Sequence, residues 1–127
     1  MSLVLLIVYA VVMKKYSGSC HCGGVEFEAT VDIADSYVCD CSICSRKGSV
    51  MNRVTAGDFR ILKGRDLLSE YTFNTGVGKH FFCSNCGVQT FHNPRSAPDI
   101  YSINLRCVPE VDIETLSPRQ VYGSKLD

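Results

Sequence analysis

The sequence has no excess of charge of either sign, and this absence excludes several classes of function. Thirteen basic residues balance thirteen acidic ones in a chain of 127 residues. A neutral balance argues against nucleic acid, or an anionic membrane surface, as an obligatory partner. The sequence also lacks an internal repeat of fixed period and any low-complexity tract. A chain of this length without repeats is expected to form one globular domain.

Long apolar runs are also absent, apart from residues 3–13 near the start of the chain. That run is shorter than the roughly 20 residues a helix needs to cross a bilayer. Lys14 and Lys15 follow it, whereas a secretion signal carries its positive charge before the apolar stretch. We therefore expect no membrane partner and a reducing, cytoplasmic compartment. Residues 1–15 are interpreted as an apolar extension, expected to pack against the chain's own sheet or to form a homodimer contact.

The remainder, residues 16–127, is interpreted as the domain proper, and it is patterned as short strands separated by turns. Val25-Glu26-Phe27-Glu28-Ala29 alternates apolar and acidic side chains, the period of a half-buried strand. Other stretches bounded by turn residues are also expected to be strands; they are residues 36–38, 50–54, 59–62, 68–73, 79–82, 88–92 and 100–105. One turn of helix is expected near residues 112–116. The pattern predicts an all-β domain with its cysteines at strand ends and turns.

Cysteine is abundant, and seven of the eight cysteines fall into three tight clusters. The clusters are Cys20-His21-Cys22, Cys39-Asp40-Cys41-Ser42-Ile43-Cys44 and Cys83-Ser84-Asn85-Cys86. Sulfurs at these spacings can converge on one ion at about 2.3 Å. The same spacings suit disulfides poorly, because bridged Cα atoms lie about 5.5 Å apart. A secreted disulfide framework is the rival reading, but the sequence favours a zinc protein.

The first and third clusters resemble two halves of one four-thiolate site. Glycines follow both pairs, in Cys20-x-Cys22-Gly23-Gly24 and Cys83-x-x-Cys86-Gly87. These glycines permit tight turns that aim backbone N–H groups at the sulfurs. Four cysteines with no open position are typical of a structural zinc. The plainer alternative is a set of buried free cysteines without metal.

The middle cluster supplies three thiolates, from Cys39, Cys41 and Cys44, with no obvious fourth ligand. Three protein ligands and a vacant position are the arrangement of a catalytic zinc. Such a centre is suited to binding an incoming thiol and holding it as a nucleophile. A second structural zinc completed by Cys107, His80 or His92 is one alternative, and a weakly metal-binding site is another. We expect two zinc ions per chain, the second of them labile.

Arg46 and Lys47 follow this cluster, separated from Cys44 only by Ser45. They could offset the negative charge of three thiolates or bind a substrate carboxylate, although two such residues can equally be solvated. The three histidines, His21, His80 and His92, are expected to pack or hydrogen bond rather than ligate metal.

These residues resemble a known family, that of the glutathione-dependent formaldehyde-activating enzyme and centromere protein V. The resemblance is carried by Gly18-Ser19-Cys20-His21-Cys22-Gly23-Gly24-Val25, by the middle cluster and by Phe82-Cys83-Ser84-Asn85-Cys86-Gly87. It covers residues 16–108. Two stretches, Tyr71-Thr72-Phe73-Asn74-Thr75 and Cys86-Gly87-Val88-Gln89-Thr90-Phe91, are more similar to the centromere protein V branch.

The resemblance implies a β-tent fold of antiparallel sheets around a structural zinc. Carried over by position, Cys20, Cys22, Cys83 and Cys86 would hold that zinc. Cys39, Cys41 and Cys44 would hold a catalytic one, where glutathione meets formaldehyde. The resulting hypothesis is a zinc-dependent carbon–sulfur lyase or synthase acting on adducts of a small, glutathione-like thiol and an aldehyde such as formaldehyde. The alternative is a non-catalytic, zinc-stapled interaction module of the centromere protein V type, although the chain lacks that protein's basic extensions.

Overall fold

The computed structural model describes residues 12–126. The expected packing of the apolar run, and the homodimer contact it would make, concern residues that lie almost wholly outside this range. Only Val12 and Met13 at its end are described, and they are 63% and 52% exposed. Packing of the run against a sheet or a second copy therefore stays a prediction.

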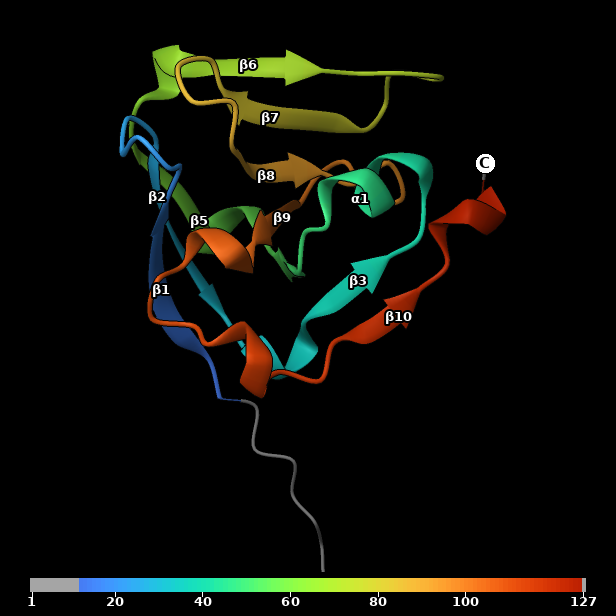
Figure 1. Ribbon diagram of the computed structural model, residues 1–127, viewed down its shortest axis with the longest axis horizontal. Helices are drawn as coiled ribbons and strands as arrows, with labels where there is room; N and C mark the ends of the chain where they lie inside the picture. The colour runs from blue at the N-terminus through green and yellow to red at the C-terminus, as the bar shows by residue number, and fades with distance from the viewer. Residues whose placement is uncertain (1–11, 127) are drawn as a thin grey trace, which may run out of the picture.

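Two sheets make up the described chain (Figure 1), which confirms the all-β prediction. The smaller sheet has the order β1-β2-β5, with bounds Lys14–Ser19, Glu26–Val31 and Phe59–Lys63. The larger sheet has the order β10-β3-β4-β9-β8-β7-β6. Its strands, in chain order, are β3 (Tyr37–Cys39), β4 (Met51–Val54), β6 (Leu68–Tyr71), β7 (Lys79–Cys83), β8 (Gln89–Asn93), β9 (Tyr101–Asn104) and β10 (Arg119–Val121). All pairings are antiparallel except that of β10 with β3.

The core lies between the two sheets. Strand β2 follows the expected alternation, because Phe27 and Ala29 are fully buried while Glu26 and Glu28, which alternate with them, are partly exposed. From the smaller sheet Phe59 reaches across to Phe91 of β8, and their ring centroids are 4.8 Å apart. Tilted aromatic pairs at this separation add about 0.5–1.5 kcal/mol beyond the area they bury. This packing fixes the two sheets against each other, and so fixes the strands that carry the cysteines.

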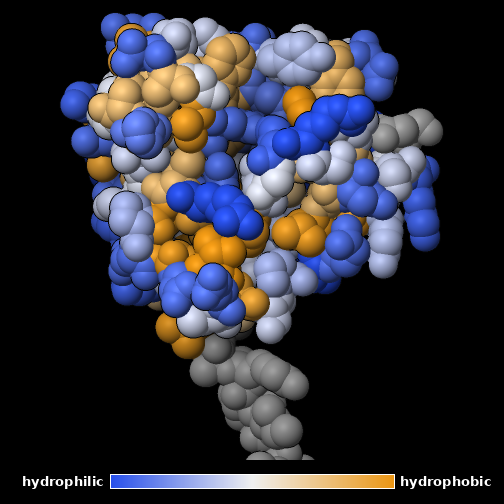
Figure 2. All heavy atoms as spheres, in the orientation of Figure 1, coloured by the Kyte–Doolittle hydropathy of each residue, from blue (hydrophilic) through white to orange (hydrophobic). Residues whose placement is uncertain are grey.

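One α-helix, α1 (Ser42–Lys47), lies among the residues that the structure describes. Short 3₁₀ turns occupy many of the loops, namely η1 (Ile33–Asp35), η2 (Ala56–Asp58), η3 (Arg65–Leu67), η4 (Leu105–Cys107), η5 (Ile113–Thr115) and η6 (Gly123–Leu126). The turn η5 coincides with the helical turn expected near residues 112–116. No helix in residues 12–126 is long and apolar enough to cross a membrane. In the view of Figure 2, strongly apolar side chains gather in the lower half of the face, below the position of α1.

The structure differs from the sequence-based expectation at three places. Strand β1 begins at Lys14, within the segment interpreted as an extension, and pairs along its length with β2. Residues 42–47 form a helix rather than a loop, so one cysteine of the middle cluster is helical. Strand β10 follows the strand that was expected to be the last. Each difference depends on strand pairing or helix capping, and the periodicity of a short stretch of sequence does not reveal either of these.

Candidate metal centres

The first and third cysteine clusters come together in the structure. The Sγ atoms of Cys20, Cys22, Cys83 and Cys86 all lie within 4.8 Å of one another. The Sγ atom of Cys22 is 3.6 Å from that of Cys20 and 3.7 Å from that of Cys83, a residue 61 positions along the chain. Four thiols at these separations can surround a single tetrahedral ion. We call them the four-cysteine group.

Backbone turns direct donors at these sulfurs. The Val25 N–H donates to Cys20 Sγ at 3.3 Å, and the Gly24 N–H donates to Cys22 Sγ at 3.4 Å. Hydrogen bonds from the Cys22 and Val88 backbone N–H groups lower the pKa of Cys86 to about 6. A thiol with this pKa is deprotonated at neutral pH, and the thiolate is the form that ligates metal. The residues present therefore fit a thiophilic dication.

The glycines of both turns have the conformation expected from the sequence. Gly23 and Gly87 each have φ of 78°, in the left-handed region that other residues enter only with strain. The Gly87 N–H donates to the Cys83 carbonyl at 2.7 Å, and the Gly23 N–H donates to the Cys20 carbonyl at 3.2 Å. Each turn thus brings its two cysteines to the same side of the chain.

The middle cluster forms a second group, in which Cys39, Cys41 and Cys44 place their Sγ atoms within 4.8 Å of one another. Cys39 ends strand β3, and Cys41 is the N-cap of helix α1. The Cys41 sulfur accepts a hydrogen bond from the Cys44 backbone N–H at 3.4 Å. The helix ends at Gly48, whose φ of 65° and N–H bond to the Cys44 carbonyl form a left-handed cap. We call these residues the three-cysteine group.

No fourth histidine, cysteine or carboxylate joins this group within residues 12–126. The three candidates raised by the sequence lie elsewhere. The Cys107 thiol donates to the Gln89 carbonyl at 3.5 Å and packs in the main core. His80 Nδ1 lies 3.2 Å from Lys47 Nζ, and the His80 ring stacks on that of His92 at 5.2 Å. The group therefore offers three thiols, and we call the side on which a fourth ligand would stand its open side.

Lys47 is a cation that interacts electrostatically with all three of these cysteines. Burial lowers its pKa, and the sulfurs of the three-cysteine group act in the opposite direction, that of Cys44 most strongly. Burial, together with the Lys47 charge, lowers the pKa of His80 to about 4. His80 is therefore neutral at physiological pH, so its Nδ1 accepts a hydrogen bond from the Lys47 ammonium. This bond fixes the position of the charge.

A hollow of about 190 Å³ lies beside helix α1, the helix that carries Cys44, although none of the three cysteines lines it. Its walls include Ile43 and Lys47 from α1 and His80 from β7, and it is also lined by Tyr71, Phe82, Gly87 and Gln89. Arg46, adjacent in sequence, is not among the lining residues; its guanidinium donates to the Ser42 carbonyl of its own helix at 2.7 Å. The structure thus separates two cations that the sequence could not distinguish. We call this hollow the Lys47 pocket.

Sequence reasoning missed three parts of this pocket: Tyr71, Phe82 and Gln89. A strand pattern in the sequence does not say which face of the strand adjoins a helix from elsewhere in the chain. Strand pairing aligns Tyr71 with His80 across β6 and β7. That alignment is what brings them to the same pocket.

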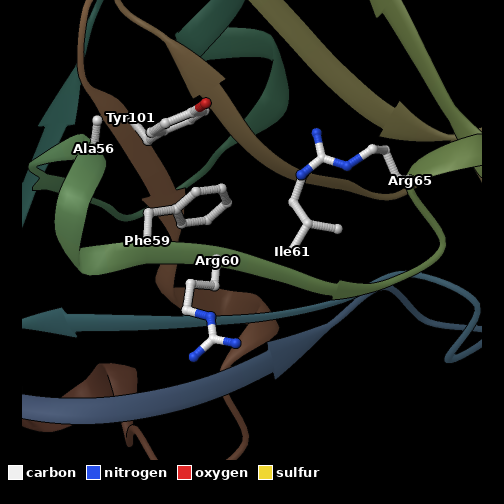
Figure 3. A pocket seen from close by; sticks show the side chains of 6 residues that line it. All are labelled: Ala56, Phe59, Arg60, Ile61, Arg65 and Tyr101. Carbon is white, nitrogen blue, oxygen red and sulfur yellow. The ribbon is translucent and has the colours of Figure 1, made fainter.

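A larger hollow, of about 280 Å³, lies between the two sheets and away from both cysteine groups (Figure 3). The rings of Phe59 and Tyr101 stack there with centroids 4.3 Å apart. Arg65 lies across from the Tyr101 hydroxyl, whereas Arg60 points toward β2, where its guanidinium lies 3.6 Å from Glu28. No histidine lines this hollow, whereas the Lys47 pocket is lined by His80 and by Lys47, a cation that interacts electrostatically with the three-cysteine group.

Comparison with known proteins agrees with this geometry. The family described as glutathione-dependent formaldehyde-activating enzyme matches residues 15–122 of the chain. A crystal structure of a Rhodobacter sphaeroides protein, solved as a structural genomics target, has 36% sequence identity to this chain and superposes on it with a TM-score of 0.77. The match covers 84% of this chain and 98% of the other. Both cysteine groups lie inside the family match.

Proposed function

Because this chain belongs to the glutathione-dependent formaldehyde-activating enzyme family, we propose that it is a zinc-dependent carbon–sulfur lyase or synthase. Its substrates would be adducts of a small, glutathione-like thiol and an aldehyde such as formaldehyde. Zinc would be held by the four-cysteine group as a structural ion and by the three-cysteine group as a catalytic one. We also assign the two-sheet arrangement to the β-tent fold that the family resemblance implies.

The observation that carries the proposal is the open side of the three-cysteine group. Three thiol ligands without a fourth, next to a pocket, are the arrangement that leaves room for an incoming ligand. The four-cysteine group has no such room, because its four sulfurs already make a complete set. A structural module would need only the latter. The Lys47 pocket also supports the enzyme over the module, because it offers room for an incoming ligand that a structural module would not need.

Zinc bound to the three thiolates would lower the pKa of an added thiol and hold it as a thiolate. The chain's own residues would do the rest. The Lys47 ammonium, placed by His80, would offset the accumulated negative charge. As the sulfur adds to the aldehyde carbon, the carbonyl oxygen takes the electron pair and a proton from Lys47. Lys47 would then take up from solvent a proton equal to the one released when the thiol bound, so the net reaction would join thiol and aldehyde into a hemithioacetal, and the reverse would split it.

Binding of glutathione to the zinc-loaded protein should release about one proton near neutral pH, because coordination favours the thiolate. Calorimetric titration in two buffers of different ionisation enthalpy measures this release directly. Cys41→Ser should abolish the binding of glutathione and of a small uncharged thiol alike, since it removes a ligand that both need. If no thiol binds at millimolar concentration with both groups loaded, the lyase proposal fails and the interaction module takes its place.

A further inference from the structure

The chain that follows β10 returns to the three-cysteine group. Ser124 donates two hydrogen bonds to the Asp40 carboxylate, from its backbone N–H at 3.0 Å and from its hydroxyl at 2.7 Å. Asp40 stands between two of the three cysteines in sequence, and its own N–H donates to the Val121 carbonyl at 3.2 Å. Figure 1 shows this segment running beside the end of β3. We call Gly123 and Ser124 the C-terminal clasp.

The clasp lies directly against the sulfurs. A Cβ atom added at Gly123 would lie 2.6 Å from Cys39 Sγ and 2.9 Å from Cys41 Cβ, closer than non-bonded atoms approach. Only glycine allows the backbone to come this near. The Gly123 carbonyl also accepts a hydrogen bond from Arg95 Nη2 at 2.8 Å. The backbone of the clasp is therefore anchored from two directions, by Asp40 and by Arg95.

The clasp and the Lys47 pocket lie on different flanks of the group. Gly123 approaches Cys39 and Cys41, whereas Lys47 lies at the far end of α1, three residues after Cys44, and lines the pocket. The pocket is lined by α1 and by residues within 71–89, and none of its lining residues belongs to the C-terminal segment. The family match ends at residue 122, so the clasp lies beyond the part of the chain that the family match covers.

We propose that the C-terminal clasp closes one flank of the three-cysteine group. A thiol then reaches the centre from the Lys47 pocket alone, and a metal held by the three sulfurs escapes slowly. Gly123 and Ser124 act as positioning residues, because they touch the ligand loop and not the substrate. The role in metal retention rests on the proposed function; the shielding of Cys39 does not.

The test compares the zinc-loaded full chain with a variant that ends at Tyr122 and with Ser124→Ala. Zinc release to a chromophoric chelator is followed in time, where the three-cysteine group gives the faster phase. Loss of hydrogen bonds to a charged acceptor should accelerate that phase about tenfold in the truncated chain, and less in Ser124→Ala. Lys125→Ala is the matched control, since its side chain lies over the Tyr122 ring and both bonds to Asp40 remain. It should release zinc at the rate of the unchanged chain.

A second readout needs no metal. Alkylation of Cys39 by iodoacetamide, located by mass spectrometry after chelation, should be faster in the truncated chain. Thermal melting checks that the truncated chain keeps its fold, as expected because β10 is retained. Equal release and equal alkylation in the truncated and full chains would overturn the clasp. A full chain that binds only one zinc would instead overturn the proposed function, and the alkylation rates would still decide on the clasp.

Discussion

Replacing Cys83 with serine should leave the chain unfolded or insoluble. The Cys83 side chain is fully buried, and its sulfur lies 3.7 Å from that of Cys22, 61 residues away in sequence. Structural zinc contributes about 10–16 kcal/mol of apparent binding free energy in small zinc domains. A whole domain has a free energy of unfolding of only about 5–15 kcal/mol. Removing one ligand from the proposed site therefore removes as much stability as the fold has to lose. Soluble yield, circular-dichroism melting and zinc content measure the outcome.

Cys107→Ser is the matched control for this prediction. Cys107 is also buried, at 8% exposed, but it belongs to neither cysteine group. Its thiol donates to the Gln89 carbonyl, and a serine hydroxyl can make the same bond. We expect this variant to fold, bind the same amount of zinc and lose about 1–2 kcal/mol of stability. A Cys83→Ser chain that melts cooperatively at the unchanged temperature would show that the four-cysteine group is not needed for folding.

The second large effect is expected at Lys47. Lys47→Met should weaken glutathione binding about ten- to a hundredfold, because a charge-assisted contact is worth about 1.5–3 kcal/mol. The loss of positive charge should also move the binding curve to higher pH, since the thiolate loses a stabilising neighbour. Methionine retains the length and apolar stem of lysine, and its burial has no charge to desolvate. We therefore expect the fold to be as stable as before.

Arg46→Met provides the comparison, with the same kind of charge removed one residue earlier. Its guanidinium is bonded to the Ser42 carbonyl and lies outside the pocket lining, so thiol affinity should change by less than about twofold. Calorimetric titrations of both variants with glutathione at several pH values separate the two residues. Equal losses in Arg46→Met and Lys47→Met would mean that general charge attraction, and not the placement of Lys47, governs binding.

Local spacing was enough to predict which cysteines group together, in sets that could hold a metal ion, and to predict most of the strand pattern. Cysteines two or three positions apart lie on one turn whatever the rest of the chain does, so Cys20 with Cys22 and Cys83 with Cys86 could be read as pairs. The alternation in β2 likewise reports a local property, the two faces of a strand. The structure has both features as the sequence predicts, because they depend only on residues that are neighbours in sequence.

Tertiary structure alone decided which polar groups surround the open side. Arg46 and Lys47 are adjacent in sequence, but neighbouring residues on a helix point about 100° apart, and only the packing of α1 against His80 directs Lys47 inward. The parallel pairing of β10 with β3 brings Gly123 close to the sulfur of Cys39. The two segments are far apart in sequence, since Ser124 lies 84 residues after Asp40, to which it is hydrogen bonded. The sequence alone was enough to predict the cysteine pairs and the three-cysteine group of the proposed metal sites, because the spacing within each cluster is local. The approach to those ligands depends on long-range contacts, which no local period encodes.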